Sequence, residues 1–339
     1  MKDYKNHGTG VGSVAGGLRY GVASKTNLCL IKISNWAKNP HNPDNDNYLK
    51  RATTAGALLN GIEHAFDHIA KRRASGDRGY SIFSMSFNLE NDRPHRKILE
   101  DRLKDAWAED IVTVTTAGND GIDAARLTFL HHTTPQSYGT ADNGLITVGG
   151  LRRDGSLWPH TTPDDHVLTG SMTLYAQAED VVRADADSLR GSVTESGTSF
   201  AAPAVAGLAA YFLSLPSLQG KFRPGSVSTD VKKYLVQHAY QRVLPGRDNI
   251  IHDPEKAQAI ARYTIPETIP CAYNLVYQEL CQAHAGPAKR SLDNESAVLH
   301  QRRDEREYVS ESLIMESGTI VATPYTEYAV CGTTSLCAD

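Results

Sequence analysis

The sequence of 339 residues lacks the apolar segments that mark membrane and leader sequences. No run of about 18 uncharged apolar residues is present, which excludes a candidate transmembrane helix. Residues 1–7 have no apolar core, so we expect no signal peptide in this chain. The net charge is only −4, which implies no general affinity for nucleic acid or for an anionic membrane. These absences favour a globular protein with one large α/β domain and a small appendage.

Cysteine is scarce and unevenly placed. Cys29 stands alone in an apolar run, and we expect it to be a buried thiol. The four others lie in the C-terminal part, where two disulfides would suit a secreted protein and free thiols are the alternative; spacing does not fix the pairing. His284 and His300 do not fall at a recognised zinc-ligand spacing. The four are Cys271, Cys281, Cys331 and Cys337.

Hydrophobic patterns predict strands that alternate with helices. Short apolar or β-branched runs predict strands at residues 29–33, 80–87, 111–116, 145–149 and 172–175. Apolar residues at helical spacing predict helices at 52–73, 96–110, 201–213 and 228–239. The remainder is expected to form a helix start or tight turn at 7–17, a loop at 35–50 and short strands with turns at 151–196. The alternation predicts a mostly parallel sheet between helices, with ligands at the carboxyl ends of its strands.

The composition of the chain and its hydrophobic pattern change beyond about Thr264. Pro266 and Pro270 interrupt the pattern, and the polar, highly charged stretch that follows shows no sustained apolar periodicity. We therefore expect one α/β domain over residues 1–262 and a poorly packed extension over residues 263–339, which two disulfides could clip together. Asn294 begins a glycosylation sequon, a triplet that often arises by chance.

Two glycine-containing patterns do not carry the functions they first suggest. Gly10-x-Gly12-x-x-Ala15 fits a dinucleotide-binding fingerprint, but the residues before it are polar and no acidic residue follows at the required distance. Gly197-x-Ser199 is not the nucleophile elbow of an α/β-hydrolase, because position 201 is alanine.

Three other short motifs carry chemistry when they are considered together. His7 precedes Gly-Thr, Asn119 follows a strand within Ala-Gly-Asn, and Ser199 opens a helix within Gly-Thr-Ser-x-Ala-Ala-Pro. Taken singly, they would be a surface histidine, a turn residue and a helix cap. A serine nucleophile needs an adjacent base, for which histidine is suited, and the oxyanion that forms needs preorganised donors. A helix N-terminus supplies unpaired N–H groups beside the serine.

In this order and at these separations, the three motifs resemble the His, oxyanion and Ser blocks of the subtilisin-like serine peptidases, the subtilases of peptidase family S8. The resemblance covers roughly residues 1–262. It implies a three-layer α/β fold and hydrolysis of peptide bonds, with Ser199 as nucleophile and His7 as general base. The side-chain amide of Asn119 and the backbone N–H of Ser199 would bind the oxyanion.

The resemblance also implies a substrate cleft, partners and a location. Ser86, Phe87 and Asn88 would line the substrate cleft, with Asn88 where the family usually has glycine. Protein or peptide substrates, a monomer and a secreted location are expected, with no nucleic-acid or membrane partner. No cofactor is implied; family members often bind calcium, but no ligand cluster stands out here.

The third member of the catalytic triad has no counterpart in the sequence. In the family an Asp on an earlier strand precedes the His, whereas only six residues precede His7. Asp3 is too close in sequence to end a separate strand, and we expect it to be a solvated carboxylate. Loss of the acid lowers turnover about 10⁴-fold in such triads. We expect a chain truncated before the Asp block, with the first core strand missing and a strand edge exposed. The alternative is an inactive relative that binds peptides or a partner.

Overall fold

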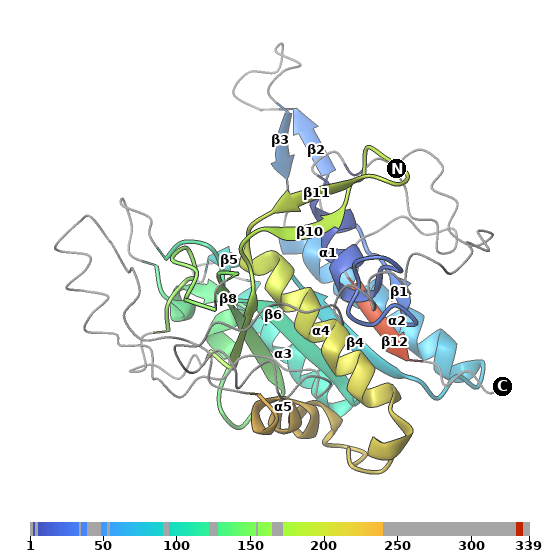
Figure 1. Ribbon diagram of the computed structural model, residues 1–339. Helices are drawn as coiled ribbons and strands as arrows, with labels where there is room; N and C mark the ends of the chain where they lie inside the picture. The colour runs from blue at the N-terminus through green and yellow to red at the C-terminus, as the bar shows by residue number, and fades with distance from the viewer. Residues whose placement is uncertain are drawn as a thin grey trace, which may run out of the picture.

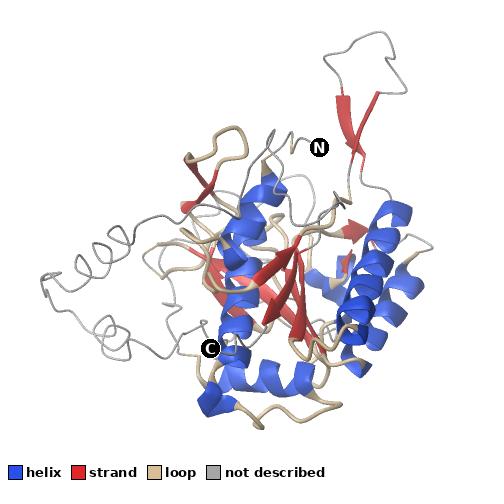
Figure 2. Cartoon of the chain, turned by 90° about the vertical axis from the view of Figure 1, so that its right-hand side faces the viewer, coloured by secondary structure: helices blue, strands red, loops and turns tan. Residues whose placement is uncertain are grey.

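A six-stranded sheet lies between two layers of helices (Figures 1 and 2). The computed structural model describes residues 3, 6–33, 35–38, 49–52, 55–90, 95–121, 128–153, 155–164, 172–239 and 330–334. The strand order is β1-β12-β4-β6-β8-β9, and β4, β6, β8 and β9 run parallel. The expected α/β architecture with a mostly parallel sheet is therefore confirmed.

The strands predicted over residues 80–87, 111–116, 145–149 and 172–175 are found with small shifts at their ends. The strand predicted over residues 29–33 was largely wrong, because only Cys29 of that range lies in a sheet strand, Asn27–Cys29. The sheet consists of β1 (Asn27–Cys29), β4 (Tyr80–Met85), β6 (Ile111–Thr116), β8 (Leu145–Leu151), β9 (Leu174–Gln177) and β12 (Val330–Thr334). Three small ribbons pair β2 (Asn35–Lys38) with β3 (Leu49–Ala52), β5 (Leu89–Glu90) with β7 (Thr133–Thr134), and β10 (Val181–Ala184) with β11 (Ser192–Glu195). The prediction of a loop over residues 35–50 was wrong at its start and its end, where β2 and β3 pair.

The helices divide between the two faces of the sheet. One layer contains α1 (His7–Gly16), α4 (Thr198–Ser214) and α5 (Val227–Gln237), and the other contains α2 (Ala55–Ala74) and α3 (Arg96–Ala108). Single 3₁₀ turns occur at Leu130–His132, Gln136–Tyr138 and Pro216–Leu218. Figure 1 shows α1 and α4 side by side in front of the sheet.

Alternation along each strand sends side chains to opposite layers. Ile82 packs in the cluster beneath α4, and its neighbour Phe83 packs in the cluster beneath α2. Helix α4 is apolar on nearly every side because α1 covers what the sheet does not. The two helices touch closely at Gly207, where a β-carbon would lie 2.4 Å from the carbonyl oxygen of Ala15. Small residues in α4 therefore permit the three-layer packing.

Strand β12 occupies the place where we expected an exposed edge. It pairs antiparallel with β1 on one side and antiparallel with β4 on the other, so β1 and β4 run parallel to each other. The edge of β4 is therefore covered by a strand from the C-terminal part of the chain, and the expectation of an unpaired edge there was wrong. Only Val330–Thr334 of the predicted extension is described, so the division at residue 262 stays a prediction.

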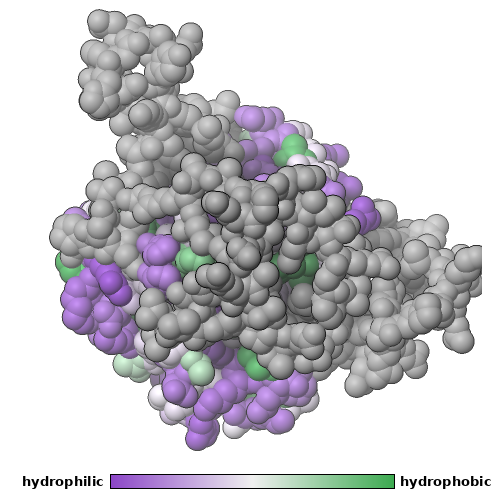
Figure 3. All heavy atoms as spheres, turned by 90° about the vertical axis from the view of Figure 1, so that its left-hand side faces the viewer, coloured by the Kyte–Doolittle hydropathy of each residue, from purple (hydrophilic) through white to green (hydrophobic). Residues whose placement is uncertain are grey.

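Figure 3 shows the hydropathy of one face of the molecule. On the face in Figure 3, hydrophobic residues form small separate spots among hydrophilic ones. Two large exposed apolar side chains lie in separate turns: Leu18 follows α1, and Leu189 lies between β10 and β11. Among the described residues, no helix is long and apolar enough to cross a membrane.

Candidate active site

Ser199 lies in the first turn of α4, as the sequence predicts. Its side chain is partly exposed, whereas Gly197 and Thr198 before it are buried. The N–H of Gly197 donates to the carbonyl oxygen of Ala178 at 2.7 Å, which fixes the chain as it enters the helix. The serine hydroxyl is thus placed beside the N–H groups of a helix N-terminus, where negative charge is stabilised.

Asn119 is held against this helix end through Thr198. The amide oxygen of Asn119 accepts from the Thr198 hydroxyl at 2.7 Å and from the Thr198 N–H at 3.0 Å. Because the oxygen is engaged, the amide nitrogen is the end left to face the site, and it lies 3.5 Å from a β-carbon built on Gly197. This orientation presents the donor end of the amide to the first turn of α4.

Thr198 itself joins α4 to the carboxyl end of β6. Its fully buried hydroxyl accepts from the Thr116 hydroxyl at 2.5 Å and from the Gly118 N–H at 3.2 Å. Gly118 has φ +104°, and a β-carbon there would lie 2.7 Å from the Thr162 hydroxyl, so this turn requires glycine. The sequence analysis assigned no role to Thr198. The only feature of the sequence that could have pointed to it is its position next to Ser199.

The predicted substrate-binding residues follow β4. The hydroxyl of Ser86 donates to the carbonyl oxygen of Ser199 at 2.8 Å, which brings this segment directly to the candidate nucleophile. Phe87 is partly buried. Asn88 is exposed, and its amide nitrogen lies 3.7 Å from a β-carbon built on Gly118. The side chain of Asn88 therefore extends toward the turn that carries Asn119.

Gln136 ties the ends of β4 and β6 together beneath this segment. Its side chain is fully buried, and its amide nitrogen donates to the carbonyl oxygen of Thr116 at 2.7 Å and to that of Phe87 at 3.2 Å. It follows a cis peptide bond between Thr134 and Pro135. The sequence gave no signal for this residue, because its partners are distant in the chain.

His7 begins α1 and contacts the first turn of α4. The centroid of its ring lies 5.8 Å from that of Phe200, the residue after Ser199. The structure therefore brings His7, Asn119 and Ser86 each against Ser199 or one of its immediate neighbours. Their chemical roles remain predictions.

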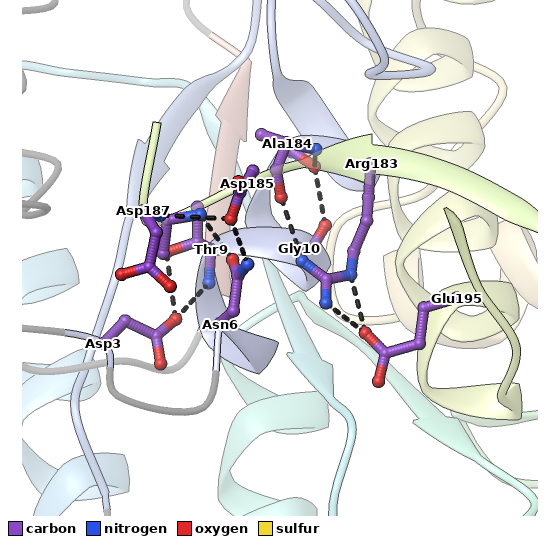
Figure 4. Close-up of polar contacts among 11 residues, drawn as sticks. Asp3, Asn6, Thr9, Gly10, Arg183, Ala184, Asp185, Asp187 and Glu195 are labelled. Atoms are coloured by element: carbon purple, nitrogen blue, oxygen red, sulfur yellow. Dashed lines mark hydrogen bonds and ion pairs between the residues drawn. The ribbon is translucent and has the colours of Figure 1, made fainter. Parts of the chain in front are cut away.

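The N-terminus of α1 is anchored to the segment after β10 (Figure 4). Asn6 has φ 59°, a left-handed conformation that asparagine tolerates better than most residues. Its amide nitrogen donates to the Asp185 carboxylate at 2.5 Å, and its amide oxygen accepts from the Ala186 N–H at 2.5 Å. Since His7 directly follows Asn6, these two contacts fix the backbone position from which the His7 side chain extends.

The buried side chain of Arg183 packs against α1 as well. The Nε of Arg183 donates to the Glu195 carboxylate at 2.7 Å, and its guanidinium lies 5.5 Å from the centroid of the Phe200 ring. A β-carbon on Gly10 would lie 2.2 Å from Cδ of Arg183, so the glycine gives the arginine room to pass α1. Neither Asn6 nor Arg183 was singled out by sequence reasoning.

The carboxylate of Asp3 forms hydrogen bonds with the first turn of α1. The expectation that Asp3 is a solvated carboxylate was therefore wrong. One carboxylate oxygen accepts from the Thr9 N–H at 2.8 Å and from the Thr9 hydroxyl at 2.9 Å (Figure 4). Burial lowers the pKa of the neighbouring Lys32, and the charge of Asp3 opposes that shift. Within the described ranges no group of three or more His, Cys, Asp or Glu side chains could hold a metal ion.

Curated relatives of this chain are named as proteases. It is 26% identical over 213 residues to the alkaline extracellular protease of Yarrowia lipolytica, which covers 63% of this chain and 41% of that protein. It is 26% identical over 266 residues to subtilisin-like protease 2 of Arthroderma otae, which covers 78% of this chain and 53% of that protein. The chain spans about half of the length of the curated relatives it matches.

One solved structure and one family model are compared with this chain, and the family model decides its membership. A cold-adapted subtilisin-like serine proteinase is similar with a TM-score of 0.48 and 22% identity, covering 70% of each chain. The model of the subtilase family matches residues 1–259, well over half of the sequence. This chain therefore belongs to the subtilase family.

Proposed function

We propose that this chain forms the catalytic part of a serine endopeptidase in which Ser199 attacks the peptide carbonyl. The observation that supports it most strongly is the way Thr198 turns the amide of Asn119 toward the first turn of α4, through bonds of 2.7 and 3.0 Å. An amide held in this way needs no reorganisation when an oxyanion forms beside it. Membership of the subtilase family supports the same chemistry.

In the proposed reaction the imidazole of His7 removes the proton of the Ser199 hydroxyl as the oxygen attacks. The tetrahedral oxyanion then accepts hydrogen bonds from the Asn119 amide and the Ser199 N–H. His7 returns the proton to the leaving amine, and water hydrolyses the acyl-enzyme by the reverse sequence. A carboxylate that orients His7 belongs to this mechanism, and we assign none of the described residues to it.

We propose that the substrate is a protein or peptide and that it lies along Ser86, Phe87 and Asn88. The hydrogen bond from the Ser86 hydroxyl to the Ser199 carbonyl oxygen supports this proposal, because it joins the segment to the proposed nucleophile. Asn88 extends toward Gly118, so its side chain would narrow the pocket for the residue before the cleaved bond. A secreted, monomeric protein with no nucleic-acid or membrane partner completes the proposal; among the relatives, one is named an extracellular protease.

A fluorophosphonate probe tests the nucleophile directly. We expect covalent labelling of the full chain at Ser199, and loss of labelling in Ser199→Ala. The matched control is Ser196→Ala, which removes a neighbouring hydroxyl that accepts from the Asp180 N–H and should leave labelling unchanged. A folded chain that stays unlabelled, with folding shown by circular dichroism and cooperative thermal unfolding, would overturn the enzyme proposal and leave a non-catalytic peptide- or partner-binding protein.

A further inference from the structure

Two cysteines from opposite ends of the sequence face each other in the central sheet. Cys29 ends β1, and in the antiparallel pairing of β1 with β12 its direct partner is Cys331. Directly opposed residues of an antiparallel pair have Cα atoms about 4.5–5.5 Å apart. Disulfides span Cα separations of about 4.4–6.8 Å. The register therefore puts the two Cα atoms at a separation that a disulfide can span.

The row that contains them borders the apolar cluster beneath α2. Cys331 is also the direct partner of Phe83 on β4, so the three residues occupy one row across three strands. Phe83 is buried in the cluster beneath α2, and Cys29 is partly buried against the same cluster. A bond formed in this row would lie beside the apolar cluster beneath α2.

The neighbouring row, on the other face of the sheet, contains a glycine. The next row joins Leu28, Gly332 and Ile82, and glycine brings no side chain to it. A small apolar cavity lies at this place between the sheet and the helices α1 and α4. It is lined by Ala15, Thr26, Leu28, Ile82, Ser84, Ala206, Gly207 and Ala210. Because Gly332 contributes no side-chain contact there, a covalent link in the neighbouring row would add to what holds β12.

We propose that Cys29 and Cys331 form a disulfide that latches β12 between β1 and β4. The two thiols would be oxidised by a small disulfide such as oxidised glutathione. One protein thiolate attacks that disulfide and releases one small thiol; the second protein thiolate then attacks the mixed disulfide and releases the other. One S–S bond is formed and one is broken, and the two protein protons pass to the released thiolates. The latch does not depend on proteolytic activity.

Peptide mapping without reduction tests the latch. The full chain is equilibrated with oxidised glutathione, alkylated and digested with trypsin, which releases Cys29 in residues 26–32 and Cys331 in residues 307–339. We expect these two peptides to be joined. Cys337 lies in the second peptide as well, so Cys337→Ser is the matched control and should keep the joined pair, whereas Cys331→Ser should lose it. Recovery of alkylated Cys29, with Cys331 either alkylated or joined to another C-terminal cysteine, would overturn the proposal.

Hydrogen exchange gives a second measurement on the same variants. Oxidation should slow amide exchange in Tyr80–Met85, the strand to which β12 pairs, in the wild type and in Cys337→Ser. It should have no such effect in Cys331→Ser or Cys29→Ser. Equal exchange in the oxidised and reduced wild type would show that no link holds β12 in place.

Discussion

At the scale of single residues, the candidate site depends on Thr198 as much as on the residues that the motifs identify. The sequence leads to His7, Asn119 and Ser199 because each stands in a short recognisable block. Thr198 adjoins one of those blocks, yet its importance comes from its contacts with Asn119 and Gly118, about 80 residues away in sequence. Partners at such separations leave no local pattern, so neither Thr198 nor Gln136 could be predicted.

Replacing Thr198 by valine should loosen Asn119 without changing the shape of the core. Valine keeps the volume but removes the hydroxyl that donates to the Asn119 amide oxygen. We expect unfolding free energy to fall by about 1–3 kcal/mol, since buried partners lose a hydrogen bond. Fluorophosphonate labelling at Ser199 should slow about tenfold, the equivalent of one weakened hydrogen bond of about 1.4 kcal/mol. Thr198→Ser, which keeps the hydroxyl, should label at close to the wild-type rate; equal rates for Val and Ser would show that the hydroxyl does not position Asn119.

At the scale of elements, the position of α1 depends on the segment that follows β10. The helix has no acidic residue in its first turn, and Asp3 and Asn6 supply the contacts at its start. Sequence periodicity predicted most helices and sheet strands because their buried residues are apolar and regularly spaced. It missed β2 and β3, whose flanks are rich in Asn, Pro and Asp. It also missed β12, which is short and contains glycine.

Substituting Asn6 should disturb this anchor and, through it, His7. Asn6→Ala removes both side-chain bonds to the segment at Asp185 and Ala186 and places alanine in a left-handed conformation that costs about 1–2 kcal/mol. Asn6→Gly removes the same bonds without that backbone cost. We expect both variants to label more slowly at Ser199, with the melting temperature lower in Asn6→Ala than in Asn6→Gly. Unchanged labelling in both would mean that His7 is placed by other contacts.

At the scale of the whole molecule, a buried lysine makes stability depend on pH. Lys232 on α5 donates to the carbonyl oxygens of Thr140 and Leu145, and burial lowers its pKa from 10.5 to about 8. Between these two values the unfolded chain holds a proton that the folded chain has lost. The free energy of unfolding therefore rises with pH across this window, by about 3 kcal/mol over its full width. Burial raises the pKa of Tyr138 to about 12, which acts in the opposite direction above pH 10.

Urea unfolding at pH 8, 9 and 10 measures this effect. The wild type should gain stability at each step, and Lys232→Met should show a much flatter profile because the titrating group is gone. Lys233→Met is the matched control: its side chain is exposed on the same helix, so its profile should follow the wild type. If Lys232→Met kept the wild-type slope, the rise would have to come from other groups.

The position of β12 in the sheet has a consequence for biosynthesis. A ribosome delivers β1, β4, α4 and α5 before it delivers Val330–Thr334, yet β12 pairs with both β1 and β4. Until then, the facing edges of β1 and β4 present unpaired N–H and C=O groups, which are templates for pairing with other chains. Pairing across so much intervening sequence is also slow to form. The nascent chain therefore passes through a period in which its sheet is open between β1 and β4, and this is when it would most need a chaperone.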